Sequence, residues 1–370
     1  MAVLKYKIQL HSHLTTGMRH ETIWELAQQK GLDLGYKSVE DIQEKTRLKE
    51  GTTLANYLKE IFVFTKVVVG DRDAMERVAY EEAIDQAAEG VLYSEMLLCP
   101  QPLASSSVAQ RWQGMPESMV SVRDVLDAAL RGLRKAELAT GAKFRIVLSC
   151  TRGRPDWAPE VLELCREYRD RGVVGIDVCG VVGLEDAQSM QVGPDAREYG
   201  EEFTDPRIID TFQRAVSYGV HRTVHAAEAG PPATLLRAVR ELHAERIGHG
   251  YRAVAEGGDA YRQALAAGVH FECCPTSSYL TGSVDRNAAE HPILRLKRDG
   301  ASFSLNTDNP AITHTTLNDE YQLALKLGLT PDDILRCNRS AISASFLPDV
   351  EKWELEQKFN RLICSDSANA

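Results

Sequence analysis

The segment His11-Ser12-His13 places two imidazoles on alternate residues at the end of an apolar run. Alternate side chains of a β-strand point to the same face, so the two rings would lie side by side if residues 7–13 form a strand. Two imidazoles on one face can ligate a metal ion. The pattern is weak on its own, because it also occurs by chance.

Three further segments carry similar groups just after apolar runs: His225 followed by Glu228, His249 in the sequence Ile-Gly-His-Gly, and Asp308 in Asn-Thr-Asp-Asn-Pro. Separately, each has an ordinary explanation, such as an acid at a helix start, a hydrogen-bonded core histidine or a turn aspartate. Together with the first segment, they place imidazoles and carboxylates at the C-terminal ends of four predicted strands. An α/β barrel builds its active site there, so we expect a metal site.

The residue types narrow the choice of metal. Three neutral imidazoles and one carboxylate, with a position left for water, suit a catalytic zinc ion. The run 173–179 contains no lysine that could bridge two metals, so we expect one ion per chain. Other zinc signatures are missing from the sequence, since it has no HExxH motif and Cys273-Cys274-Pro275 does not form PCxxC.

Eight short apolar runs, each followed by a helical pattern, predict the elements that position these groups. Continuous apolar runs are typical of parallel strands covered by helices, and eight such units predict a (β/α)8 TIM barrel. The predicted strands are 7–13, 91–98, 144–150, 173–179, 222–226, 246–250, 269–274 and 302–306.

Two longer connections interrupt this alternation. Residues 18–88 have a helical pattern throughout and are expected to form a helical insertion between strands one and two, near the barrel mouth. Residues 180–205 form a long connection after strand four that could contribute to a lid. Without a linker, repeat or low-complexity stretch, we expect one metal-dependent barrel domain over residues 1–370.

The composition of the 370 residues is that of an ordinary globular protein with a formal net charge of −10. This charge argues against a nucleic-acid partner, which would require a clustered basic face. The eight cysteines show no CxxC pair or disulfide spacing. No apolar stretch is long enough to span a membrane, and no signal peptide is recognisable, so we expect a cytoplasmic protein with reduced thiols and no membrane partner.

With these motifs, the chain resembles the adenosine deaminase branch of the amidohydrolases. The resemblance rests on LHSHL, TVHAAEAG, ERIGHG, CCPTSSYLTG, HPI and SLNTDNP, which occur in the family's order from about residue 7 to 347. It implies zinc-dependent hydrolytic deamination of the 6-amino group of a purine nucleoside. It also implies that zinc is held by His11, His13, His225 and Asp308.

The resemblance further implies roles at the substrate. Glu228 would hydrogen-bond the purine N1, His249 would face the water bound to the metal, and the backbone amide of Gly180 would meet N3. Water activated by zinc would attack C6, while a protonated Glu228 delivers a proton to N1. Asp308 and His249 would orient the nucleophile and help to pass a proton to the leaving amine.

Several positions depart from the family pattern. Thr15 stands where adenosine-using relatives carry an acidic residue that contacts the ribose 5′-hydroxyl, and Ala227 replaces a glycine. Asn309 replaces the second aspartate of the family's TDD motif, which faces N7, and its amide can still donate a hydrogen bond to that atom. These changes cluster around the sugar and the base edge, which favours an unusual or modified substrate.

Tyr57, Leu58, Ile61 and Phe62 correspond to a helix that closes an apolar lid beside the ribose in the family. Their spacing equally describes an ordinary core face. The alternatives for function are the same deamination on free adenine, a 5′-modified adenosine or a biosynthetic aminopurine, and a catalytically idle barrel kept for binding. The intact ligand set and Glu228 count against the idle barrel.

Overall fold

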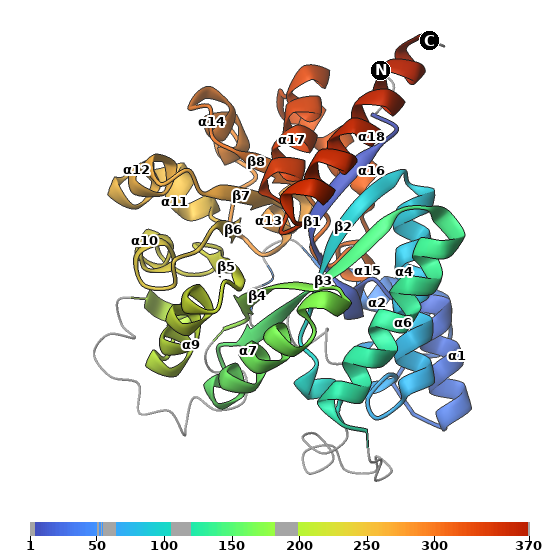
Figure 1. Ribbon diagram of the computed structural model, residues 1–370. Coiled ribbons are helices and arrows are strands. Elements are labelled where there is room, and N and C mark those ends of the chain that lie inside the picture. Colours follow the sequence, from blue (N-terminus) through green and yellow to red (C-terminus); the bar gives the residue numbers. More distant parts are fainter. Residues whose placement is uncertain are drawn as a thin grey trace.

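Eight parallel strands arranged in sequence order form the centre of the molecule (Figure 1). The computed structural model describes residues 4–49, 52, 54, 64–104, 120–181 and 199–368. The strands are β1 (Lys7–His13), β2 (Val91–Leu98), β3 (Lys143–Thr151), β4 (Val173–Cys179), β5 (His221–Ala226), β6 (Arg246–His249), β7 (His270–Cys273) and β8 (Phe303–Leu305). They agree with the eight predicted runs to within one residue at either end.

The sheet closes between its first strand and the segment that follows its last strand. Ser12 forms a parallel bridge with Asp308, His13 N donates to Asp308 O at 2.7 Å, and Asp308 N donates to His11 O at 3.2 Å. This closure, with helices surrounding the strands, confirms the (β/α)8 TIM barrel (Figure 1). The same contacts bring residues from both ends of the sequence to one point of the barrel mouth.

Helices pack around the outside of the strands (Figure 1). Those of the described residues are α1 (His20–Lys30), α2 (Val39–Thr46), α4 (Arg72–Ala88), α6 (Val122–Thr140), α7 (Ala158–Glu167), α9 (Pro206–Ser217), α10 (Pro232–Arg240), α11 (Tyr251–Glu256), α12 (Asp259–Ala266), α13 (Pro275–Leu280), α14 (Pro292–Arg298), α15 (Pro310–Thr313), α16 (Leu317–Leu327), α17 (Pro331–Ala344) and α18 (Asp349–Ala368). Short 3-10 helices connect several of them: η1 (Leu14–Thr16), η2 (Gln101–Leu103), η3 (Pro155–Trp157), η4 (Arg169–Arg171) and η5 (Gly200–Glu202).

Local sequence signals set the ends of the long helices. Ser121 and Asp124 form a reciprocal capping box at the start of α6, and Gly141 ends that helix with a φ of 72°. Thr330 and Asp333 cap α17 in the same way, with Pro331 in the first turn. The residue types at these ends are those that favour helix starts and stops.

The expected helical insertion over residues 18–88 is not confirmed. The described part of this segment contains α1, α2 and α4, and residues 31–38 between α1 and α2 are not helical. Helix α4 packs against α6 and β2, so it is the helix that covers the first βα unit. The predicted lid residues Tyr57, Leu58, Ile61 and Phe62 lie outside the described residues, as do residues 182–198 of the long connection.

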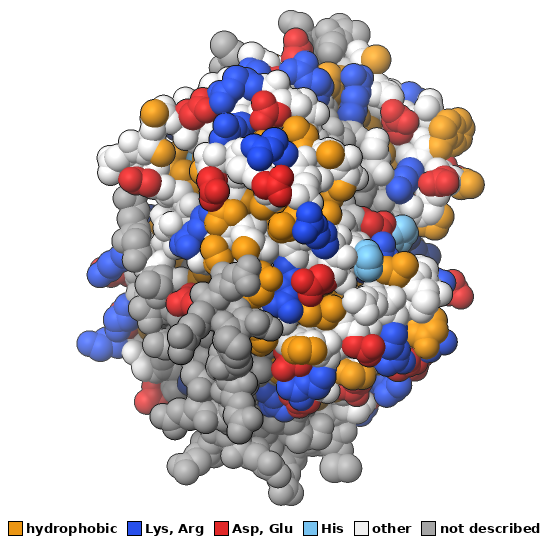
Figure 2. Space-filling view, turned by 90° about the vertical axis from the view of Figure 1, so that its left-hand side faces the viewer, with side chains coloured by type: hydrophobic (Ala, Val, Ile, Leu, Met, Phe, Trp, Pro, Cys, Tyr) orange, Lys and Arg blue, Asp and Glu red, His pale blue; other side chains and the backbone are white. Residues whose placement is uncertain are grey.

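The surface carries charges of both signs. On the face in Figure 2, acidic and basic side chains are interspersed. In the described part of the chain, no helix has the length and apolar character needed to cross a membrane. All eight cysteines are free thiols, and five of them are buried.

Candidate metal and active site

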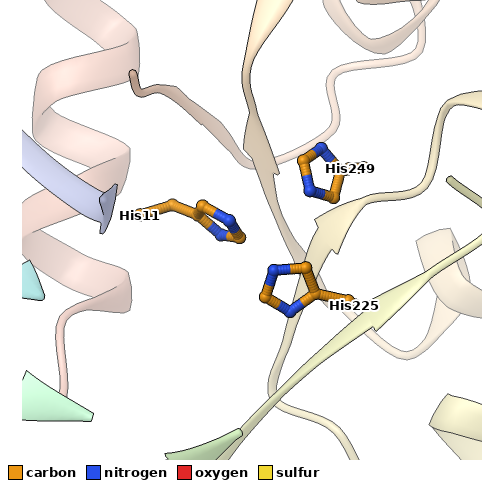
Figure 3. Close-up of side chains that lie close together, drawn as sticks. All are labelled: His11, His225 and His249. Carbon is orange, nitrogen blue, oxygen red and sulfur yellow. The ribbon is translucent and has the colours of Figure 1, made fainter. Parts of the chain in front are cut away.

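His11 and His13 point to the same side from the end of β1, and they meet two further histidines from β5 and β6. The rings of His11, His225 and His249 face one another across the barrel mouth (Figure 3). Their ring centroids lie 4.6 Å apart for His11 and His225, and 5.0 Å for His11 and His249. Gly248 makes this approach possible, because a Cβ there would lie only 2.9 Å from His11 Cε1.

Buried carboxylates fix two of these imidazoles. His11 Nδ1 lies 2.6 Å from Glu272 Oε2, and His225 Nδ1 lies 2.9 Å from Asp177 Oδ1. Burial favours the acid form of both carboxyl groups, but the charges and hydrogen bonds around them outweigh it and lower both pKa values. A carboxylate only accepts hydrogen bonds, so Nδ1 of each imidazole carries a proton, and the neutral form, which a metal ion requires, has its lone pair on Nε2.

These lone pairs point at one another. His225 Nε2 lies 3.3 Å from His13 Nε2, and His11 Nε2 is buried without a hydrogen-bond partner. Asp308 Oδ1 completes the group at 3.5 Å from His11 Nε2 and 3.4 Å from His13 Nε2. Acceptor atoms this close repel one another unless a proton or a metal ion lies among them.

The donor set therefore fits a metal ion. The possible ligand atoms of His11, His13 and Asp308 lie within 4.8 Å of one another, as do those of His11, His225 and His249. Imidazoles that donate their second N–H to a carboxylate are the usual arrangement at a zinc site. The four residues that the sequence predicted as ligands, His11, His13, His225 and Asp308, thus converge in the structure.

Glu228 lies on the other side of His249. The two side chains are almost fully buried, and Glu228 Oε2 lies 3.6 Å from His249 Nε2. Burial, followed by the negative charge of Asp308, raises the pKa of the Glu228 carboxyl well above its usual range. Burial also lowers the pKa of His249, so its imidazole is neutral. A protonated carboxyl and a neutral imidazole thus stand beside the metal-binding atoms, which suits general acid–base chemistry.

Asn309 is held by its neighbours in one orientation. Its Nδ2 donates to Asp308 Oδ1 at 2.6 Å, and its Oδ1 accepts from Thr16 Oγ1 at 2.7 Å. The acceptor-only carboxylate of Asp308 requires the amide nitrogen on its side, which leaves the amide oxygen for Thr16. Thr15 is half-buried in η1 next to this contact, and Gly180 follows β4 with a φ of 77°.

The sequence predictions missed the residues that support the ligands. Asp177 and Glu272 orient His225 and His11, and Ser277 Oγ donates to Asp308 Oδ2 at 2.6 Å. The sequence does indicate two of these residues, because Asp177 and Glu272 are acidic residues within short, mostly apolar strands. A buried charge requires a partner, which could have been sought among the histidines. The contact of Ser277 has no comparable signal in the sequence.

Comparisons with known proteins agree with this geometry. The adenosine deaminase family model matches residues 6–361. Adenosine deaminase from Xenopus laevis is 39% identical over 355 residues, which cover 96% of this chain and 94% of that protein. The Mus musculus enzyme is 37% identical over 358 residues, covering 96% and 97%.

Solved structures share the architecture. The N6-methyl-AMP deaminase from Arabidopsis thaliana has a TM-score of 0.76 and 27% identity, with 99% of this chain and 98% of that chain covered. The adenine deaminase from Arthrobacter aurescens has a TM-score of 0.79 over 97% of this chain and 99% of that chain, and at 23% identity it supports the fold alone. With the family matched over nearly its whole length and relatives above one-third identity, this chain belongs to the adenosine deaminase family.

Proposed function

We propose that this chain hydrolytically removes the 6-amino group of adenosine or an adenosine-like purine, giving the inosine-type product and ammonia. The observation that carries the proposal is the convergence of metal-binding atoms beside the buried, protonated carboxyl of Glu228. Membership of the adenosine deaminase family supports the same reaction.

The cofactor of this proposal is one zinc ion per chain, held by His11, His13, His225 and Asp308. Three imidazoles with one carboxylate are a ligand set that zinc accepts, and the carboxylate partners of His11 and His225 keep Nε2 available. When bound, zinc would lower the pKa of a water molecule to near neutrality.

The protein groups then handle the protons. As the water oxygen adds to C6, electron density moves to N1, and Glu228 donates its proton there. His249, which is neutral, accepts a proton from the attacking water, and Asp308 orients that water. The C6–N bond breaks and ammonia leaves with the proton from His249. The C6 hydroxyl loses its remaining proton, which restores the acid form of Glu228, and the product keeps the new oxygen at C6 and the hydrogen at N1.

Substrate recognition involves groups around this centre. In the proposal, the amide of Gly180 meets N3 and the amide of Asn309 donates to N7. Thr15 would lie near the ribose. The residues predicted for the apolar lid, Tyr57, Leu58 and Ile61, lie outside the described residues.

A 5′-modified adenosine is a second candidate substrate. Thr15 is uncharged where adenosine-using relatives carry an acid, so a 5′-phosphate would meet no carboxylate at this position. The Arabidopsis thaliana relative is named for a deamination of N6-methyl-AMP.

Ammonia release from a panel of aminopurines tests the proposal. The panel contains adenosine, 2′-deoxyadenosine, adenine, AMP and N6-methyl-AMP, with bound metal measured in the same samples. Turnover of at least one member is expected, and the preferred one identifies the substrate. Metal-loaded protein that turns over none of them would contradict the proposal and favour the binding-only alternative.

The Glu228→Gln variant tests the role of the acid. It should retain the metal and lose about 10²- to 10⁴-fold in turnover, because an amide cannot donate an acidic proton to N1. Activity close to that of the parent would show that another group protonates the ring.

A single domain over residues 1–370, a cytoplasmic location and the absence of nucleic-acid or membrane partners remain predictions. Fractionation of cells that express the chain at natural levels, and limited proteolysis of the purified protein, test them directly.

A further inference from the structure

A second buried carboxylate, Glu202 at the end of η5, faces the turn that carries Glu228. Its side chain is almost fully buried. Oε1 accepts hydrogen bonds from Glu228 N at 2.9 Å and Ala229 N at 2.8 Å. Oε2 accepts from Ala227 N and from Thr234 Oγ1, both at 2.7 Å. Three consecutive backbone amides and one hydroxyl therefore surround a single carboxylate.

The turn requires such support because its backbone is strained. Ala227 has a φ of 52°, in the left-handed region that residues with a Cβ avoid. Such a conformation persists only where the surroundings hold it. Immediately after it, the chain turns Glu228 towards His249. The direction of the proposed acid thus depends on a turn that is unfavourable for alanine.

Arg152 fixes the backbone of Glu202 from the other side. This buried guanidinium follows β3 and donates from Nε to Glu202 O at 3.1 Å. It also donates from Nη1 to Gly180 O at 3.0 Å and from Nη2 to His225 O at 2.6 Å. The ends of β3, β4 and β5 are thereby joined to Glu202.

Close packing leaves Glu202 little freedom. A Cβ on Gly230 would lie 2.7 Å from Glu202 Oε2 and 2.9 Å from its Cβ. The carboxylate is therefore enclosed between the 227–230 segment and the start of α10.

We propose that Glu202 is a positioning residue for Glu228: its carboxylate holds the backbone of residues 227–229 so that the Glu228 side chain is aimed at the reacting purine nitrogen. The proposal rests on the proposed function of Glu228. A merely structural role, as an acid near the start of α10, would affect stability but not turnover of the folded enzyme.

Glu202→Gln is the first test, with Glu201→Gln as its matched control. Glu201 is the neighbouring glutamate in η5, and it is exposed. The amide that replaces the Glu202 carboxylate would place an N–H against the backbone N–H groups of residues 227–229. The backbone of this turn should therefore be held less tightly. We expect kcat to fall about 10- to 100-fold in Glu202→Gln, with KM changed less and the bound metal unchanged. Glu201→Gln should match the parent.

Ala227→Gly provides a suppressor test. Glycine adopts a positive φ without strain, so a turn with glycine at position 227 should depend less on the Glu202 carboxylate. Added to Glu202→Gln, it should recover a large part of the lost kcat. Failure to recover any kcat, or a kcat within twofold of the parent in Glu202→Gln alone, would overturn the proposal.

Thr234→Val tests the positioning role of Glu202 if Glu202→Gln does not fold. It removes only the hydroxyl that lies 2.7 Å from Glu202 Oε2 and 2.8 Å from Ala227 N. We expect about a three- to tenfold lower kcat, and an unchanged kcat would overturn the proposal.

Amide hydrogen exchange tests the role of Glu202 independently of the proposed deaminase function. The amides of residues 227–229 should exchange faster in Glu202→Gln than in Glu201→Gln, whatever the substrate. If the parent has no purine turnover but this difference is found, only the proposed function and its dependent role for Glu228 fail. Equal exchange in the two variants overturns the positioning by Glu202.

Discussion

Replacement of Glu272 by glutamine should weaken metal binding through the orientation of His11. Glu272 accepts from three donors: His11 Nδ1 at Oε2, and Thr223 Oγ1 and Arg246 Nε at Oε1. An amide offers only one oxygen to these donors. If that oxygen stays with Arg246, the amide N–H faces His11 Nδ1, and the imidazole must carry its proton on Nε2, where it cannot ligate a metal.

The opposite orientation is also unfavourable. The amide nitrogen would then face the buried guanidinium of Arg246, whose other carboxylate partner is Glu95, 2.7 Å from Nη1. Loss of an oriented carboxylate partner of a ligating histidine typically costs about 10- to 100-fold in metal affinity. This corresponds to about 1.4–2.7 kcal/mol of binding free energy.

Competition with a chelator of known affinity measures the effect, with zinc as the probe. Glu245→Gln is the matched control. Glu245 also accepts a hydrogen bond from a histidine, His221 Nδ1 at 2.8 Å, but both side chains are partly exposed and are not among the proposed metal ligands. We expect the zinc affinity to fall in Glu272→Gln and to stay unchanged in Glu245→Gln. Equal zinc affinities in Glu272→Gln and the parent would refute the argument that Glu272 sets the tautomer of His11.

Three further predictions concern metal removal, pH and Asn309. Treatment with a chelator should abolish deamination and lower the midpoint of thermal unfolding; re-added zinc at about 100 times its Kd should restore about 2.7 kcal/mol, and an unchanged midpoint would argue against metal binding in the native state. His270 has its pKa lowered to about 3, chiefly by burial, so between pH 6.5 and 3 the unfolded chain binds a proton that the folded chain does not. The contribution of His270 to the free energy of unfolding should therefore fall by about 1.4 kcal/mol per pH unit below about 6.5, and denaturant titrations should show a smaller total fall in His270→Gln; equal slopes would contradict this assignment. Thr16→Val frees the Asn309 amide oxygen and should raise KM about three- to tenfold for purines but not for their 7-deaza analogues, while equal effects on both would exclude an N7 contact.

The sequence was sufficient for the barrel because its signals are local. Apolar runs such as 91–98 and capping pairs such as Ser121 with Asp124 specify a strand or a helix end through neighbours in the chain. The helical insertion over residues 18–88, an inference of the same kind, is not confirmed. Residues 72–88 form a regular helix, and only packing against α6 and β2 shows that this helix covers the barrel.

The candidate ligands could also be predicted, since a parallel barrel brings the C-terminal ends of its strands to one mouth. His11 and Asp308 are almost 300 positions apart in the chain, and the backbone bridge of Ser12 with Asp308 places them together. Strand order alone therefore predicts this neighbourhood.

Only the tertiary structure decided how these groups are held. The proton position on His11 depends on Glu272 from β7, and the direction of Glu228 depends on Glu202 from η5, in the connection after β4. Hydrogen bonds of this kind act over about 3 Å between residues that are distant in sequence, and they leave no periodicity for a reader of the chain. The sequence thus determined which groups meet at the barrel mouth, whereas packing determined their protonation and aim.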